Sequence, residues 1–324
     1  MKPTRKFRSV SALVALSVIA VTAITFFARD DHSTSTLSYI VQGKSLSEMQ
    51  SVMSEYGVEV SHELGIIRAV AAELTEEQVI ELRSHEAVRR VYSNDAVEVA
   101  GKPGGSNSGS SYTTVDTHYA SLVNAHAVHN MGVTGAGVGI AVLDTGLWKH
   151  DGIRYNPAGR TRLTGLYNAM TDTESKSAVS GDDPGGHGSH VASIAVSSLT
   201  TADGVYNGIA PGANLISVQA FDETGHGTYA DVVRAIDWVV SNKSKNKIRV
   251  LNLSFSAPAR SHYWDDPINQ AVMVAWQNEI FVVAAAGNAG PDPMTIGVPG
   301  NVPYVMTVGA MTDNFTPDDE ADDK

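Results

Sequence analysis

The sequence contains no cysteine among its 324 residues. This absence excludes disulfide bonds, thiolate nucleophiles and zinc sites built from cysteine. Basic residues are also scarce, because 23 Lys and Arg stand against 35 Asp and Glu, giving a formal net charge of -12. Such an acidic balance argues against nucleic acid as a partner, since phosphate binding needs a basic face.

Hydrophobic residues make up 43% of the chain, which is enough to bury a full core. The amino terminus carries four basic residues at positions 2–8, and an uncharged apolar stretch follows at positions 10–28. This pattern predicts a secretory signal peptide at residues 1–30 and a secreted or extracytoplasmic protein. Val21-Thr-Ala23 is a candidate cleavage site, while Phe26-Phe27 keep an uncleaved anchor open as the alternative.

Residues 38–99 have the pattern of a separate α+β module with the order βαββαβ. Two capping boxes, Ser45-Leu-Ser-Glu48 and Thr75-Glu-Glu-Gln78, each predict the start of a helix. The last strand is expected from residues 88–92 together with residues 97–99. Residues 100–112, rich in Gly and Ser, then have the composition of a flexible, protease-accessible linker.

From residue 113 to residue 324, apolar strands alternate with amphipathic helices. This alternation predicts an α/β fold with a doubly wound, mainly parallel sheet. In that architecture, ligand sites form beyond the carboxyl ends of the strands. Strands are expected at residues 137–143, 213–221, 249–255, 280–286 and 304–310, and helices at residues 187–199, 228–242 and 266–277.

Three polar side chains stand at such strand ends or helix starts. Asp144 follows a buried strand, where a carboxylate can orient an imidazole. His187 stands between two glycines at the start of a helix, which suits a general base. Asn288 follows a run of small residues, where its amide can stabilise an oxyanion. Alone, Asn288 fits an ordinary Asn-Ala-Gly turn equally well.

Two other chemistries lack a necessary part. Asp144-Thr-Gly is the signature of pepsin-like aspartic proteases, but the second Asp-Thr-Gly or Asp-Ser-Gly that such a chain needs does not occur, which leaves this interpretation a remote alternative. His187 and His190 form a His-x-x-His pair, but the zincin motif requires longer spacing and a glutamate. We therefore expect no metal site there, and we expect His190 to face the core.

Two further segments, Gly225-His-Gly227 and Ser254-Phe-Ser256, are weaker signals. Each is consistent with backbone that pairs with an extended peptide, and each is equally consistent with a simple turn. The sequence does not choose between these interpretations.

Asp144-Thr-Gly, His187-Gly-Ser-His190 and Ala285-Ala-Gly-Asn288, in this order, resemble the motifs of the subtilisin-like serine proteases, or subtilases. The resemblance implies a secreted serine endopeptidase with polypeptide substrates, in which Asp144 orients the general base His187 and Asn288 donates to the oxyanion. It also implies that residues 38–99 are an inhibitory, chaperone-like propeptide and a partner of residues 113–324. A monomer without a required cofactor is expected. By the same analogy, the pocket for the residue before the scissile bond is lined by Ser254, Phe255, Ala285, Ala286 and Gly287.

The chain departs from the family pattern at three places. Ser256 stands where the family has a glycine that pairs with substrate, and Leu147-Trp-Lys-His-Asp151 does not match the segment that supplies a calcium ligand, so a structural calcium ion is not assigned. No Gly-Thr-Ser segment, which carries the family's nucleophile, occurs before Lys324. We therefore expect residues 1–324 alone to be inactive as a truncated form. A pseudoenzyme, and an inhibitor or chaperone module at residues 38–99, are the alternatives.

Overall fold

The computed structural model describes residues 35–101, 119–175 and 183–310. The expected signal segment, most of the linker and the acidic tail lie outside these residues. Within the described ranges, no helix is long and apolar enough to cross a membrane.

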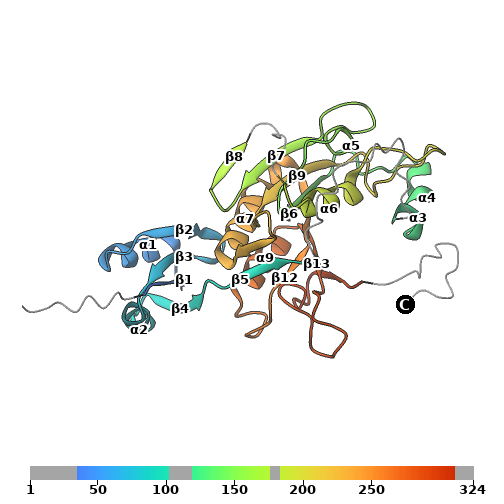
Figure 1. Ribbon diagram of the computed structural model, residues 1–324. Coiled ribbons are helices and arrows are strands. Elements are labelled where there is room, and N and C mark those ends of the chain that lie inside the picture. Colours follow the sequence, from blue (N-terminus) through green and yellow to red (C-terminus); the bar gives the residue numbers. More distant parts are fainter. Residues whose placement is uncertain (1–34, 102–118, 176–182, 311–324) are drawn as a thin grey trace, which may run out of the picture. The chain divides into compact units, whose positions relative to one another are not determined.

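The first module is an antiparallel sheet of strand order β2-β3-β1-β4 (Figure 1). Thr75 forms the expected capping box with Gln78, whereas Ser45 supplies only one half of its box, by accepting a hydrogen bond from the N–H of Glu48. The elements are β1 (Leu37–Gly43), α1 (Leu46–Glu55), β2 (Val60–Leu64), the short 3-10 helix η1 (Gly65–Ile67), β3 (Ala69–Leu74), α2 (Glu76–Ser84) and β4 (Val88–Ser93).

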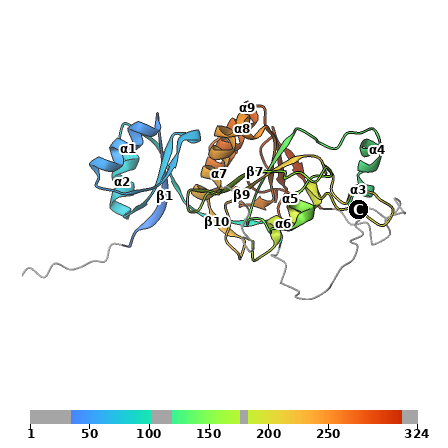
Figure 2. The same ribbon diagram turned by 90° about the horizontal axis from the view of Figure 1, so that it is seen from above.

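Side-chain alternation gives this sheet two buried faces. Val41 and Val70 pack under α1 and α2, together with Met49 of α1. Their neighbours in sequence, Ile40 and Ala71, point to the opposite face and belong to the larger core that contains α7 and α9. The module is therefore covered by its own helices on one face and by the rest of the protein on the other (Figure 2).

One expectation about this module is wrong. Residues 97–99 do not complete its sheet, because β5 (Ala96–Val99) pairs antiparallel with β10 (His226–Thr228) and β12 (Phe255–Ser256). The strand is drawn away from β4 because Val97 and Val99 bury their side chains in the larger core. The module thus sends its last strand between two strands of the following domain.

The second part is the predicted doubly wound α/β sheet, with strand order β14-β13-β11-β6-β9-β7-β8. Its strand pairs are parallel except for β7 with β8. The strands are β6 (Gly139–Asp144), β7 (Leu163–Asn168), β8 (Thr173–Ser175), β9 (Asn214–Gln219), β11 (Ile248–Leu253), β13 (Phe281–Ala285) and β14 (Met306–Val308). The helices are α3 (Tyr119–Leu122), α4 (Ala125–Asn130), α5 (Asp151–Arg154), α6 (His187–Val196), α7 (Tyr229–Ser241), α8 (Lys243–Asn246) and α9 (Pro267–Gln277).

Helices cover both faces of this sheet, which explains the continuous apolar character of its central strands. Ala192 and Val196 of α6 pack with Val142 on one face, while α7 and α9 pack with Ala141 and Leu143 on the other. Figure 2 shows α6 and α7 on opposite sides of the sheet. Since β6, β11 and β13 are parallel, their carboxyl ends meet at one edge, where ligand sites form.

Candidate active site

Asp144 and His187 form a hydrogen-bonded pair at this edge. Asp144 ends β6 and is 1% exposed, and its Oδ1 accepts a hydrogen bond of 2.6 Å from Nδ1 of His187, the first residue of α6. The other ring nitrogen, Nε2, lies 3.3 Å from the carbonyl oxygen of Ala100. The carboxylate thus pairs with an imidazole, unlike the two-carboxylate arrangement of pepsin-like enzymes.

A second buried carboxylate, Asp183, holds this pair in place and was missed from the sequence. Asp183 is 0% exposed, and its Oδ2 accepts hydrogen bonds from the backbone N–H (2.7 Å) and the hydroxyl (2.6 Å) of Ser189. Its Oδ1 accepts from the Thr145 hydroxyl at 2.6 Å and from the Gly186 N–H at 3.1 Å. Asp183 therefore caps the start of α6, where Gly186 has no capping side chain. It also connects α6 to Thr145, the residue after Asp144.

The electrostatic surroundings favour the charged form of His187. The hydrogen bond to Asp144 raises the pKa of His187 above its usual value, burial opposes this effect, and the negative charges of Asp144 and Asp183 add to the rise. Nδ1 of the ring faces Asp144, and Nε2 faces the carbonyl oxygen of Ala100. Because its surroundings stabilise the protonated ring, His187 is suited to accept a proton during a reaction.

Substituting Asp144→Asn is expected to lower the pKa of His187, because the variant removes both the charge-assisted hydrogen bond and the charge. Since a raised pKa stabilises the folded state most at pH values below the unfolded pKa of about 6.5, the stability that this pair contributes is lost as pH rises through the folded-state pKa. An NMR titration of the His187 Cε1 proton measures the shift. The exposed Asp203→Asn is the matched control, and an unchanged titration in Asp144→Asn would contradict the assigned partner.

The structure places Asn288 at the same edge of the sheet. It lies three residues after the end of β13, which is separated from β6 only by β11. With strands about 4.8 Å apart, its backbone is roughly 10 Å across the sheet from that of Asp144. Asn288 is exposed, and Gly287 before it has a φ of +97°, which turns the chain at the end of the strand. Its role as an oxyanion donor remains a prediction.

Both weaker sequence signals lie beside β5. The N–H of Val99 donates to the carbonyl of Gly225 at 3.0 Å, and Gly227 is paired with Val97. On the other side, the N–H of Ala100 donates to the carbonyl of Ser254 at 2.7 Å. These segments therefore pair with extended chain and are not isolated turns.

The residues expected to line the pocket divide between two places. Ser254 and Ser256 lie beside β5, whereas Ala285, Ala286 and Gly287 lie at the end of β13, and all five are partly exposed. Phe255 is 0% exposed and packs in the main core with Phe221, with a ring separation of 5.3 Å. The expectation for the Phe255 side chain is wrong, because strand alternation turns it to the face opposite Ser256.

His190 is also not where it was expected, since it is exposed on α6. The buried face of this helix consists of Gly188, Ser189, Ala192 and Val196. In the described ranges, no group of three His, Asp or Glu side chains has the arrangement of a metal site.

Comparison with known proteins identifies a family for this chain. A model of the Peptidase S8, or subtilase, family matches residues 135–321. The chain belongs to this family. It is similar to the serine protease AprX of Bacillus subtilis (strain 168), with 36% identity over 195 residues, covering 59% of this chain and 42% of that protein. Subtilisin E of the same strain is 29% identical over 313 residues, which are 93% of this chain and 73% of that protein.

Solved structures support the subtilase fold. Fervidolysin from Fervidobacterium pennivorans, described as a keratinolytic enzyme related to subtilisin, superposes with a TM-score of 0.62 at 20% identity, covering 86% of this subtilase and 43% of that chain. The epidermin leader peptide processing serine protease of Staphylococcus aureus gives a TM-score of 0.61 at 16% identity, with 85% and 69% covered. At this identity, the likeness shows the fold.

Proposed function

We propose that this subtilase is a secreted serine endopeptidase in which Asp144, His187 and Asn288 act with a serine carried by sequence after Lys324. The observation that carries the proposal is the position of Ala100. Its N–H and carbonyl are held by Ser254 and His187, as a peptide at a hydrolytic site would be. Membership of a serine protease family supports the same chemistry.

The reaction proposed is acyl transfer. The serine hydroxyl gives its proton to Nε2 of His187 while its oxygen attacks the substrate carbonyl carbon, and Asp144 stabilises the resulting imidazolium. The side-chain amide of Asn288 donates to the oxyanion. His187 then protonates the departing amine as the C–N bond breaks, and water hydrolyses the acyl-enzyme by the same steps.

The substrate proposed is an extended polypeptide that binds as β5 does, between β10 and β12. In this register, Ala100 provides the carbonyl of the scissile bond, so cleavage of the chain itself is expected between Ala100 and Gly101. Residues 38–99 would then remain in the cleft as the inhibitory propeptide. The separate hydrophobic core under α1 and α2 supports their role as a self-contained unit.

Continuing the reading frame past Lys324 tests the proposal. The extended protein is expected to contain a Gly-Thr-Ser segment, to hydrolyse casein and to mature to an amino terminus at Gly101, as read by mass spectrometry. A stop codon directly after Lys324, with no hydrolysis, would instead support the pseudoenzyme. Hydrolysis that is blocked by pepstatin but not by a serine-directed inhibitor would support the remote aspartic alternative.

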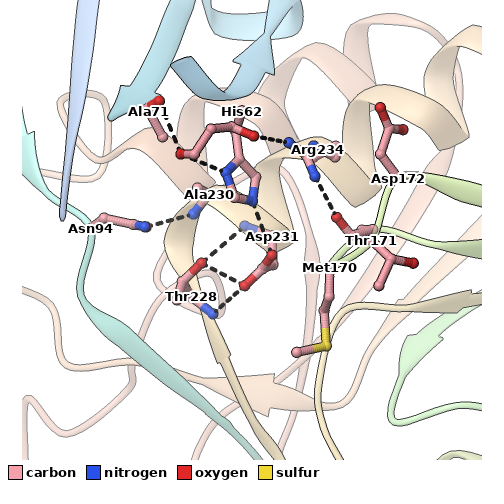
Figure 3. Close-up of polar contacts among 12 residues, drawn as sticks. His62, Ala71, Asn94, Met170, Thr171, Asp172, Thr228, Ala230, Asp231 and Arg234 are labelled. Carbon is pink, nitrogen blue, oxygen red and sulfur yellow. Dashed lines mark hydrogen bonds and ion pairs between the residues drawn. The ribbon is translucent and has the colours of Figure 1, made fainter. Parts of the chain in front are cut away.

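A second candidate function, protease inhibition by residues 38–99, is favoured by polar contacts with α7 (Figure 3). Nε2 of His62 lies 3.1 Å from Oδ1 of Asp231, and both side chains are largely buried. Arg234 donates to the carbonyl of Ser61 at 2.7 Å, and the Ala230 N–H donates to Asn94 at 2.8 Å. These contacts give the module a specific binding surface in addition to β5.

The isolated module is expected to inhibit the extended enzyme, and His62→Ala is expected to weaken this inhibition by tenfold or more, because a largely buried partner loses its hydrogen bond at a cost of about 2 kcal/mol. A steady-state inhibition assay measures both effects. His85→Ala is the control, because among the described residues His85 has no hydrogen bond to α7. Absence of inhibition by the unmodified module at high micromolar concentration would reject this candidate.

A further inference from the structure

Ser256 and Ala100 lie on the same face of the ladder between β5 and β12. The antiparallel register pairs Ser256 with Glu98 and Phe255 with Val99. Directly opposed side chains share a face and successive side chains alternate, so Ala100 falls on the face of Glu98 and Ser256. Residues in this diagonal relation have side chains about 7–8 Å apart, within reach of a long side chain.

The hydroxymethyl group of Ser256 fills the space between two glycines. A Cβ atom built on Gly287 would lie 2.6 Å from Oγ of Ser256 and 3.1 Å from its Cβ. A Cβ built on Gly297 would approach the same Oγ still more closely. The two glycines thus make room for the Ser256 side chain, and the space that a glycine at position 256 would leave open is occupied.

The segments around this space are tied together by backbone hydrogen bonds. The N–H of Gly297 donates to the carbonyl of Ala286 at 3.2 Å. Ala257 and Val298 exchange two hydrogen bonds, of 3.0 and 2.8 Å, and these two residues are 3% and 1% exposed. Moving one of these segments outward to enlarge the space beside Ser256 would break these hydrogen bonds. The size of this space is therefore determined by the side chains that enter it.

We infer that Ser256 is a specificity-determining residue, which narrows the pocket for the residue before the scissile bond to small side chains. Alanine, serine and glycine fit beside the Ser256 hydroxymethyl group, whereas phenylalanine, leucine and methionine would collide with it. The chain's own Ala100 satisfies this restriction. The inference rests on the proposed function for its substrate, because it assumes that peptides bind in the register of β5.

A double-mutant cycle tests the restriction without requiring catalysis. In the 324-residue chain, Ala100→Phe is expected to speed amide exchange in β5 about tenfold or more, because overpacking costs on the order of 1–3 kcal/mol. In the Ser256→Gly background, the same substitution is expected to change exchange by less than about threefold, since the ring enters the vacated space. Hydrogen-exchange mass spectrometry of the peptide that contains residues 96–101 gives both values.

Ala96→Phe is the matched control, because Ala96 is an exposed residue of the same strand. Its effect on exchange should be the same in both backgrounds. Ala100→Leu repeats the cycle with a smaller insertion if the phenylalanine variant does not fold. Equal effects of the substitution at position 100 in the wild-type and Ser256→Gly backgrounds would overturn the inference. Since the cycle needs no nucleophile, an enzyme that proves inactive would reject the proposed function and leave this result standing.

Discussion

Replacing His187 by alanine in the extended, serine-containing protein is expected to lower kcat for peptide hydrolysis by about a million-fold, the loss found when subtilisin loses its histidine. The physical reason is that the variant lacks the imidazole that takes the proton from the nucleophile. In the structure, Nε2 of His187 is the atom that faces the peptide carbonyl, while Nδ1 is held by Asp144. Initial rates on a chromogenic peptide with alanine before the scissile bond measure the effect.

His190→Ala is the matched control for this substitution. His190 lies three residues further along α6 and is exposed, so the change should alter kcat by no more than about twofold, as for most surface substitutions. A His187→Ala variant that keeps a tenth or more of the activity would exclude the imidazole as the general base. Equal losses in the two variants would point to disruption of α6 rather than to loss of a catalytic group.

Replacing Asp183 by alanine is expected to lower the free energy of unfolding by about 3 kcal/mol, since buried donors left without an acceptor cost roughly 1–3 kcal/mol each. The variant removes the acceptor of the Ser189 N–H and hydroxyl and of the Thr145 hydroxyl. Of these donors, the Thr145 hydroxyl retains only a longer contact of 3.3 Å, to Asp144. Urea unfolding of the wild-type and variant proteins, followed by tryptophan fluorescence, measures the difference.

Asp203→Ala provides the comparison, because Asp203 is exposed, and it should change the free energy of unfolding by less than about 0.5 kcal/mol. In the NMR titration described above, Asp183→Ala should also lower the pKa of His187, since one nearby negative charge is removed. Wild-type stability together with an unchanged His187 titration would show that Asp183 does not position the pair.

The sequence was sufficient where local patterns determine structure. The expected helix at residues 228–242 became α7 (Tyr229–Ser241), because Thr228 and Asp231 form a reciprocal capping box and one face of the helix is apolar. The expected parallel strands were found within a few residues of their predicted ends, since both faces of the sheet are buried and demand continuous apolar runs. Asp144 and Asn288 could therefore be placed at one edge of the sheet from these local patterns.

Long-range contacts explain the errors. Residues 97–99 were assigned to the wrong sheet, because a strand as short as β5 carries no information about which edge it will join. Asp183 was missed because its partners, Thr145 and Ser189, lie 38 and 6 residues away. An aspartate shortly before a helix start was the available signal. His190 is exposed because the buried face of α6 consists of Gly188, Ser189, Ala192 and Val196.

Labelling with a fluorophosphonate probe tests the central claim most directly, because such a probe reacts only with a serine that a neighbouring base has activated. The extended protein is expected to be labelled on one serine within a Gly-Thr-Ser segment after Lys324, as located by peptide mass spectrometry. His187→Ala is expected to abolish this labelling. Labelling that is absent from the extended wild-type protein, or that persists in His187→Ala, would contradict the assignment of Asp144 and His187 to a serine protease site.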